Sequence, residues 1–233
     1  MKTQWIDLFN EIAEDRKHIH LHQMSGWKDI EDIALWEDYV ADVIQGQIQP
    51  KDRIFEAGCG CGCFLLTIKK FYPDITVAGI DAAVSAIQRI QKEILPEKEA
   101  RYFKVGILPD GLNQEPSASY NIVLSNSVFQ YIQKKEDAEK SVQEMIRITK
   151  PGGKIIIADV VDEAFRSINE EKMRALWDGY GEEQGYPCHA YYAKEWWNRF
   201  QTEGNSLFIR HVDVEKYWRR KYRYVVYIDK QIA

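Results

Sequence analysis

Three glycines at alternate positions, Gly58, Gly60 and Gly62, form the segment of this 233-residue chain best suited to hold a ligand. They follow a short apolar run at 52–58 and precede a helical pattern at 64–72. Glycine lets the main chain turn sharply and lets a ligand approach the backbone closely. In open α/β sheets, ligands bind outside the carboxyl ends of the strands. The segment therefore predicts a binding loop between a strand and a helix.

An acidic residue, Asp81, ends the next apolar run at 75–81, 21 residues after Gly60. A carboxylate at this place can accept hydrogen bonds from two ribose hydroxyls. The dinucleotide-binding pattern G-x-G-x-x-G, started at Gly58, requires a glycine where the chain has Cys63. The spacing therefore does not match the dinucleotide-binding pattern.

The loop Glu56-x-Gly58-x-Gly60-x-Gly62 resembles the (E/D)-x-G-x-G-x-G motif of class I S-adenosylmethionine-dependent methyltransferases. The segment 120–131 is similar to the fourth-strand motif of that family, and 148–155 is similar to its turn into strand five. The similarity covers roughly residues 52–160, and its motifs come in the family's order. On these motifs the chain resembles small bacterial members of the family.

The resemblance implies a Rossmann-like α/β fold: a seven-stranded, mostly parallel sheet with the last strand antiparallel and helices on both faces. The residues independently favour this class, because short apolar strands alternate with helical segments. The final strand-like runs, 206–214 and 222–229, lie too close together for a helical crossover, so we expect them to pair antiparallel.

We expect a single methyltransferase domain in three parts. Helical patterns at 3–16 and 29–46 predict an N-terminal helical cap within residues 1–48. The cofactor-binding core is expected at 49–160. Residues 161–233 are expected to form a substrate-side insert, largely helical up to 202, and the final strands.

The resemblance also implies the cofactor, S-adenosyl-L-methionine, and the residues around it. Asp81 is expected to hold both ribose hydroxyls, and Glu56 to fix the loop near the amino group of the cofactor. Ile107 stands where many relatives have an aspartate bonded to the adenine, so backbone groups are expected to replace that contact. The implied cofactor-binding residues are Glu56, Gly58, Gly60, Gly62, Asp81, Ala82, Gly106, Ile107 and Asn126.

The acceptor pocket is expected between the N-terminal cap and the insert after the fifth strand. Candidate substrate-binding residues are His22, Trp27, Tyr131 and Tyr192. His189 is the candidate general base, because imidazole titrates near physiological pH. For each of these side chains, the sequence leaves a packing role open as the alternative.

Two groups of metal-ligating side chains lack the spacing of a metal site. Cys59, Cys61 and Cys63 follow a C-x-C-x-C pattern rather than paired C-x₂-C knuckles, and they occupy the loop that must meet the cofactor. His18, His20 and His22 alternate, but no strand pattern surrounds them. We expect no metal.

Charge and composition restrict the partners. The net charge of −5 disfavours nucleic acid, because an acidic protein is repelled by phosphate backbones. The basic, aromatic-rich run 216–224 could bind an anion, and we favour a charged hairpin between the last two strands. No run approaches the roughly 20 apolar residues that span a bilayer. No signal peptide or disulfide framework is recognised, so we expect a cytoplasmic protein that does not enter membranes.

Taken together, these features predict an S-adenosylmethionine-dependent methyltransferase that acts on a small polar molecule, with oxygen favoured as the methylated atom. The stretches 125–131 and 221–230 are similar to small bacterial methyltransferases that modify surface or capsular polysaccharide precursors, including phosphoramidate-type modifications. One alternative is a non-catalytic nucleotide-binding protein on the same scaffold. Another is an RNA or protein methyltransferase. The oligomeric state is not predicted.

Overall fold

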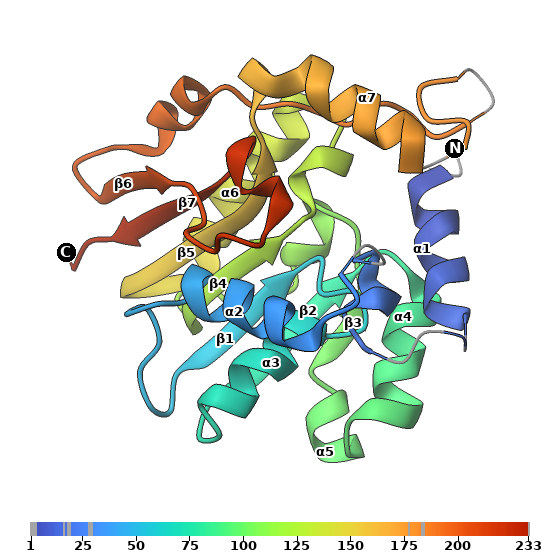
Figure 1. Ribbon diagram of the computed structural model, residues 1–233. Coiled ribbons are helices and arrows are strands. Elements are labelled where there is room, and N and C mark those ends of the chain that lie inside the picture. The colour runs from blue at the N-terminus through green and yellow to red at the C-terminus, as the bar shows by residue number, and fades with distance from the viewer. Residues whose placement is uncertain are drawn as a thin grey trace.

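The computed structural model describes residues 4–15, 17, 20–27, 30–176, 178–182 and 185–232. Its centre is a seven-stranded sheet with strand order β3-β2-β1-β4-β5-β7-β6 (Figure 1). The strands are β1 (Arg53–Ala57), β2 (Thr76–Asp81), β3 (Phe103–Val105), β4 (Tyr120–Asn126), β5 (Thr149–Val161), β6 (Asn205–Arg210) and β7 (Arg223–Lys230). The first five are parallel, and β7 runs antiparallel to both β5 and β6. The predicted fold class and the antiparallel closing pair are confirmed.

Helices cover both faces of this sheet. They are α1 (Gln4–Glu14), α2 (Ile33–Val43), α3 (Cys63–Phe71), α4 (Val84–Arg89), α5 (Glu97–Ala100), α6 (Lys135–Ile148) and α7 (Arg166–Leu176). On β4, Ile122 and Leu124 pack with residues of α2 and α3, whereas Val123 between them packs with residues of α6. Because successive side chains of a strand point to opposite faces, a strand that is apolar throughout is buried on both sides.

The two expected cap helices have different positions. Helix α2 packs against α3 and the sheet, and it buries Trp36 and Tyr39 in the main core. Its first turn is capped by Asp32, whose carboxylate accepts a hydrogen bond from the backbone N–H of Ala34 (2.9 Å). Helix α1 instead stands beside α4, above the carboxyl ends of the strands (Figure 1). Thr3, Arg16 and Asp29, at the ends of the two expected helical segments, lie outside the described residues.

The insert after β5 is less helical than expected. Among the described residues between 166 and 202, only α7 and the short 3₁₀ segment Lys194–Phe200 are helical. The described residues from 178 to 193 form turns and loops, with one isolated bridge from Tyr192 to Asp162. Gly179 and Gly181 adopt positive φ angles there, and Pro187 follows. Glycine and proline are the poorest helix formers, which explains why the helical pattern stops.

Candidate functional site

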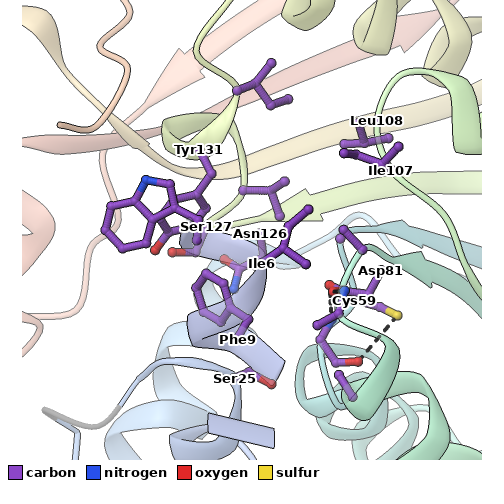
Figure 2. A pocket seen from close by; sticks show the side chains of 18 of the residues that line it. Ile6, Phe9, Ser25, Cys59, Asp81, Ile107, Leu108, Asn126, Ser127 and Tyr131 are labelled. Carbon is purple, nitrogen blue, oxygen red and sulfur yellow. Dashed lines mark hydrogen bonds between the residues drawn. The ribbon is translucent and has the colours of Figure 1, made fainter. Parts of the chain in front are cut away.

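A cavity of about 530 Å³ lies at the carboxyl ends of β1, β2 and β4, with α1 along one side. Figure 2 shows Asp81, Cys59 and Ile107 on one side of it, and Ile6, Phe9 and Tyr131 on the other. We call the first side the cofactor side and the second the acceptor side. A cavity of this size lies within the range that binds small molecules and cofactors.

The glycine loop presents its backbone to the cavity. Gly58 and Gly60 have φ angles of 84° and 50°, in the left-handed region that glycine adopts without strain. A Cβ atom on Gly58 would lie 2.4 Å from Val128 Cγ2, and one on Gly60 would lie 2.8 Å from Ser25 Oγ. Both positions therefore need glycine for conformation and for space. Gly62 is not part of the cavity lining and begins α3 as its N-cap residue.

Asp81 lies at the end of β2 and holds the glycine loop directly. Its Oδ2 accepts a hydrogen bond from the backbone N–H of Gly60, and its Oδ1 accepts one from Ala83, both at 2.7 Å. A carboxylate has about four acceptor sites, so both oxygens can accept one bond more from a ligand. Burial raises the pKa of Asp81, and the two backbone N–H groups oppose that shift.

Glu56, near the end of β1, is a buried carboxyl that lines the cavity. Its Oε2 has no hydrogen-bond partner among the described residues. Burial raises the pKa of Glu56 well above its ordinary value, and the nearby Asp81 raises it further. A buried carboxylate becomes favourable when a cation lies beside it, so this position fits a ligand ammonium group.

The remaining predicted cofactor residues border the same space. Ala82, Gly106, Ile107 and Asn126 all line the cavity. The backbone N–H of Gly106 donates to the carbonyl of Asp81 (2.9 Å), which joins the β3 end to the β2 end. The side-chain oxygen of Asn126 accepts a hydrogen bond from the hydroxyl of Tyr39 (2.6 Å), so this amide is held in place from α2.

These features define a Rossmann-like domain whose cavity can take a ribose beside Asp81 and an ammonium group beside Glu56. The sequence profile of the family described as "Methyltransferase domain" matches residues 48–205, more than half of the chain. The chain therefore belongs to this methyltransferase family.

Individual relatives agree with that assignment. A malonyl-[acyl-carrier protein] O-methyltransferase of Ilyobacter polytropus is 24% identical over 159 residues, which are 67% of this chain and 59% of the relative. The alignment thus spans about three fifths of that relative's length. A putative methyltransferase of Haloferax volcanii, solved with the Trm112 methyltransferase activator, superposes with a TM-score of 0.67 at 16% identity, over 96% of this chain and 97% of that one. Geranyl diphosphate C-methyltransferase of Streptomyces coelicolor, solved with S-adenosyl-L-homocysteine, has a TM-score of 0.60 at 12% identity and covers 95% and 88%.

The residues present fit the cofactor S-adenosyl-L-methionine. The two free acceptor sites of Asp81 suit the ribose hydroxyls. The unpartnered oxygen of Glu56 suits the amino group. Gly58 and Gly60 line the cavity, so the methionine part would lie against the backbone of this loop.

The structure separates the expected acceptor residues into two groups. Trp27 and Tyr131 line the cavity. His22 lies outside the lining, where its buried ring donates from Nε2 to the carbonyl of Ile30 (2.7 Å) and stacks on Trp36. Tyr192 is also outside, with its hydroxyl within 3.2 Å of the carbonyl oxygens of Phe129 and Ile132. Both side chains are used in packing, so the structure does not bring them to the acceptor side.

His189 is also absent from the cavity lining, although its ring lies 5.3 Å from that of Tyr131. Burial lowers the pKa of His189 well below its ordinary value, and the guanidinium groups of Arg223 and Arg219 lower it further. The ring is therefore neutral at physiological pH. A general base must reach the atom that is methylated, and His189 does not line the cavity in which that atom would lie.

Several cavity residues were not expected from the sequence. They are Trp5 and Phe9 on α1, Ser25 ahead of α2, and Ser127 and Val128 after β4. The helical spacing of Trp5 and Phe9 did predict a shared apolar face. It could not show that this face covers the cavity rather than the core, because either environment selects apolar residues.

The basic run at 216–224 lies in the connection between β6 and β7, as we favoured, but two of its arginines are not exposed. Arg219 and Arg223 are buried, and Arg223 forms an ion pair with the fully buried Asp159. Asp159 also accepts hydrogen bonds from Tyr217 and, at 2.7 Å, from Ser127. Two of the basic residues in this run are therefore buried and cannot face a nucleic acid.

The described residues hold neither a cluster suited to a metal ion nor a membrane-spanning helix. Within them, no group of three or more His, Cys, Asp or Glu side chains is arranged to hold a metal ion. His18, one of the three alternating histidines, lies outside the described residues. None of the helices in the described part of the chain has the length and apolar character needed to cross a membrane.

Proposed function

We propose that this methyltransferase transfers the methyl group to an oxygen atom of a small polar acceptor, bound on the acceptor side of the cavity. The observation that carries the proposal is the division of the cavity. Asp81 occupies one side, whereas Ile6, Phe9 and Tyr131 border the other (Figure 2). Glu56 lies close enough to Asp81 for the two carboxyl groups to interact electrostatically. The space is that of a small-molecule pocket, which favours a compact acceptor over a polymer.

The residues of the chain act by positioning. The cofactor supplies an electrophilic methyl group on a sulfonium centre. Displacement needs the acceptor oxygen in line with that methyl group at about 3–3.5 Å. Tyr131 lies at the acceptor side, and Phe9 and Ile6 of α1 exclude water from it.

The lining favours an acceptor that needs little help to lose a proton. Among the described residues that line the cavity, none is a histidine. Burial raises the pKa of Tyr131, so this phenol is protonated and can donate a hydrogen bond. A carboxylate or phosphate oxygen is already anionic and requires only orientation. The similarity to a malonyl-[acyl-carrier protein] O-methyltransferase supports oxygen as the acceptor atom.

The test is a transfer assay that detects S-adenosyl-L-homocysteine formation with a panel of small carboxylic acids, phosphate esters and sugars, followed by mass spectrometry of the product. We expect turnover with an oxygen acceptor and a methyl ester or ether as product. Methylation only at nitrogen, carbon or sulfur, or only on RNA or protein, would overturn the proposal.

A further inference from the structure

A group of buried polar side chains lies directly behind two residues of the cavity wall, Trp5 and Tyr131. The ring of His189 lies 5.4 Å from the ring of Trp5 and 5.3 Å from that of Tyr131. Asn169 links this histidine to Arg223: its Nδ2 lies 3.4 Å from His189 Nδ1, and its Oδ1 accepts a hydrogen bond from Arg223 Nη2 (3.4 Å). We call Trp5, Tyr131, Asn169, His189 and Arg223 the Tyr131 cluster. It joins the acceptor side of the cavity to the interior.

Three nitrogen atoms of the Tyr131 cluster have no hydrogen-bond partner among the described residues. They are Trp5 Nε1, His189 Nε2 and Arg223 Nε. The three residues expose only 5%, 5% and 2% of their surfaces, so bulk water does not hydrate them freely. Leaving a buried donor unpaired costs folding free energy, and a concentration of such groups in a native protein calls for a functional explanation.

All three nitrogen atoms are donors. An indole and a guanidinium nitrogen carry hydrogen and cannot accept. For His189 the tautomer follows from Asn169: because Arg223 can only donate, the group facing it is the amide oxygen, so the amide nitrogen faces His189. His189 Nδ1 is then the acceptor, and in the neutral ring the hydrogen is on Nε2. The cluster therefore offers three unmet N–H groups.

The charges around the cluster favour a negative ligand. The guanidinium groups of Arg223 and Arg219 both lower the pKa of His189. Burial has the largest effect on the pKa of Tyr131 and raises it. The two guanidinium groups lower this pKa, and Asp159 raises it by a smaller amount than either of them lowers it. Two guanidinium groups thus act on these two rings, against the single carboxylate of Asp159 that lies beside them. Asp159 holds Arg223 through Nη1, which leaves Nε available.

We propose that the Tyr131 cluster is a subsite that anchors an oxyanion of the methyl acceptor, a carboxylate or a phosphate group. This inference rests on the proposed function, because the anchored group belongs to the acceptor bound on the same side of the cavity. Trp5, His189 and Arg223 donate to the oxyanion, and charge-assisted hydrogen bonds of this kind are the stronger ones. Because His189 and Arg223 lie behind the cavity wall and not in its lining, the acceptor carries an anionic group in addition to the atom that is methylated.

The experiment uses the full chain saturated with S-adenosyl-L-homocysteine and titrates it with sodium acetate or inorganic phosphate. Binding of the anion is followed by the NMR signal of the His189 imidazole. This signal is assigned by its absence from the spectrum of the variant His189→Gln. We expect a saturable shift with at least one anion and a rise in the pKa of His189, because a bound anion stabilises the imidazolium form. The two probes distinguish a carboxylate from a phosphate subsite.

Two variants test the donors separately. Arg223→Lys keeps a positive charge beside Asp159 but removes the Nε donor, and Trp5→Phe keeps an aromatic ring but removes the indole N–H. We expect each to weaken binding of the anion by about fivefold or more, since a hydrogen bond to a charged group is lost. Arg210→Lys is the matched control: Arg210 pairs with Asp42 outside the cluster, and the anion affinity should not change.

The outcomes separate this subsite from the proposed function. A missing response to both anions, or a response that both variants leave unchanged (an adventitious ion only), overturns the subsite. If the enzyme methylates oxygen of a neutral acceptor, and neither anion competes with that acceptor, the subsite is wrong and the proposed function stands. If anions bind as expected but no oxygen acceptor is methylated, the proposed function is wrong, and the cluster then binds an anion that is not part of the acceptor.

Discussion

The two sides of the cavity are built by different means. The cofactor side consists largely of backbone: glycines in left-handed conformations, N–H groups held by Asp81, and the strand ends that carry them. The acceptor side consists of side chains from distant parts of the sequence. Tyr131 follows β4, Trp5 and Phe9 come from α1, and His189 and Arg223 lie behind them.

This difference explains which side can be recognised in a sequence. A backbone site imposes strict local requirements, because only glycine tolerates the φ angles and the close contacts at Gly58 and Gly60. A side-chain site imposes few local requirements, because several residue types can supply a donor or an apolar surface. We therefore expect substitutions on the cofactor side to act through the cofactor, and those on the acceptor side to act through the acceptor.

The largest effect is expected for Gly58→Ala. The new Cβ would meet Val128 at 2.4 Å, and the residue would keep a φ of 84°, which costs about 1–2 kcal/mol for a residue other than glycine. Together these should weaken binding of S-adenosyl-L-homocysteine by roughly a hundredfold or more, as measured by calorimetric titration. Gly46→Ala is the control, because Gly46 also has a positive φ but has no atom within 4 Å of the added carbon. Equal losses in both variants would show that the effect is general backbone strain.

A smaller loss is expected for Asp81→Ala. The change removes the acceptors for two ribose hydroxyls, with charge-assisted bonds of about 1.5–3 kcal/mol each, and it frees the N–H of Gly60. Affinity for S-adenosyl-L-homocysteine should fall by at least about tenfold. Asp52→Ala is the matched variant, because Asp52 also accepts a backbone N–H, from Gln49, but lies outside the cavity lining. Unchanged affinity in Asp81→Ala would show that the ribose lies elsewhere.

The fold and the cofactor side were predictable for a common reason. In strand 120–126, Ile122, Val123 and Leu124 are consecutive apolar residues because both faces of the sheet are covered. The helices repeat their apolar residues at the spacing that brings them to one helical face. The positions of Asp81 and Gly60 follow from a local strand–loop–helix unit, in which neighbours along the chain are neighbours in space.

The acceptor side was harder to predict because its contacts are remote in sequence. Tyr131 was named correctly as a cavity residue, since it follows a recognisable strand motif. His189 and Tyr192 follow a loop in which Gly179 and Gly181 adopt positive φ angles, and both of their rings are buried. The sequence does not show whether a ring on such a loop faces the cavity or the core. The role of Arg223 depends on Asp159, 64 residues earlier, and nothing in the run 216–224 indicates that its arginines are buried.

Glu56 should make binding of the cofactor product on the cofactor side depend on pH. In the free protein, burial and Asp81 raise the pKa of Glu56 above the ordinary 4.5, and a bound ammonium group should lower it again. Binding then releases a proton. Affinity for S-adenosyl-L-homocysteine should fall as the pH decreases through the raised pKa of the free protein, by up to about tenfold per pH unit.

Calorimetric titrations between pH 5 and 8 check this, with Glu56→Gln as the comparison. The glutamine variant should bind more weakly at high pH and lose most of the dependence on pH. A wild-type affinity that does not change over this range would mean that the ammonium group does not lie beside Glu56.

The smallest effect on binding is expected for Tyr192→Phe, which tests the boundary of the acceptor side. The hydroxyl of Tyr192 lies in the packed region behind Phe129, where it donates to carbonyl oxygens that would lose a partner. Removing it should lower the free energy of unfolding by about 1–3 kcal/mol, measured by urea titration. The affinity for S-adenosyl-L-homocysteine and the rate with saturating acceptor should stay within about twofold of the wild type, because this hydroxyl does not line the cavity. A large rise in the acceptor KM with unchanged stability would place Tyr192 on the acceptor side after all, and it would mean that the cavity extends past Phe129 when the acceptor binds.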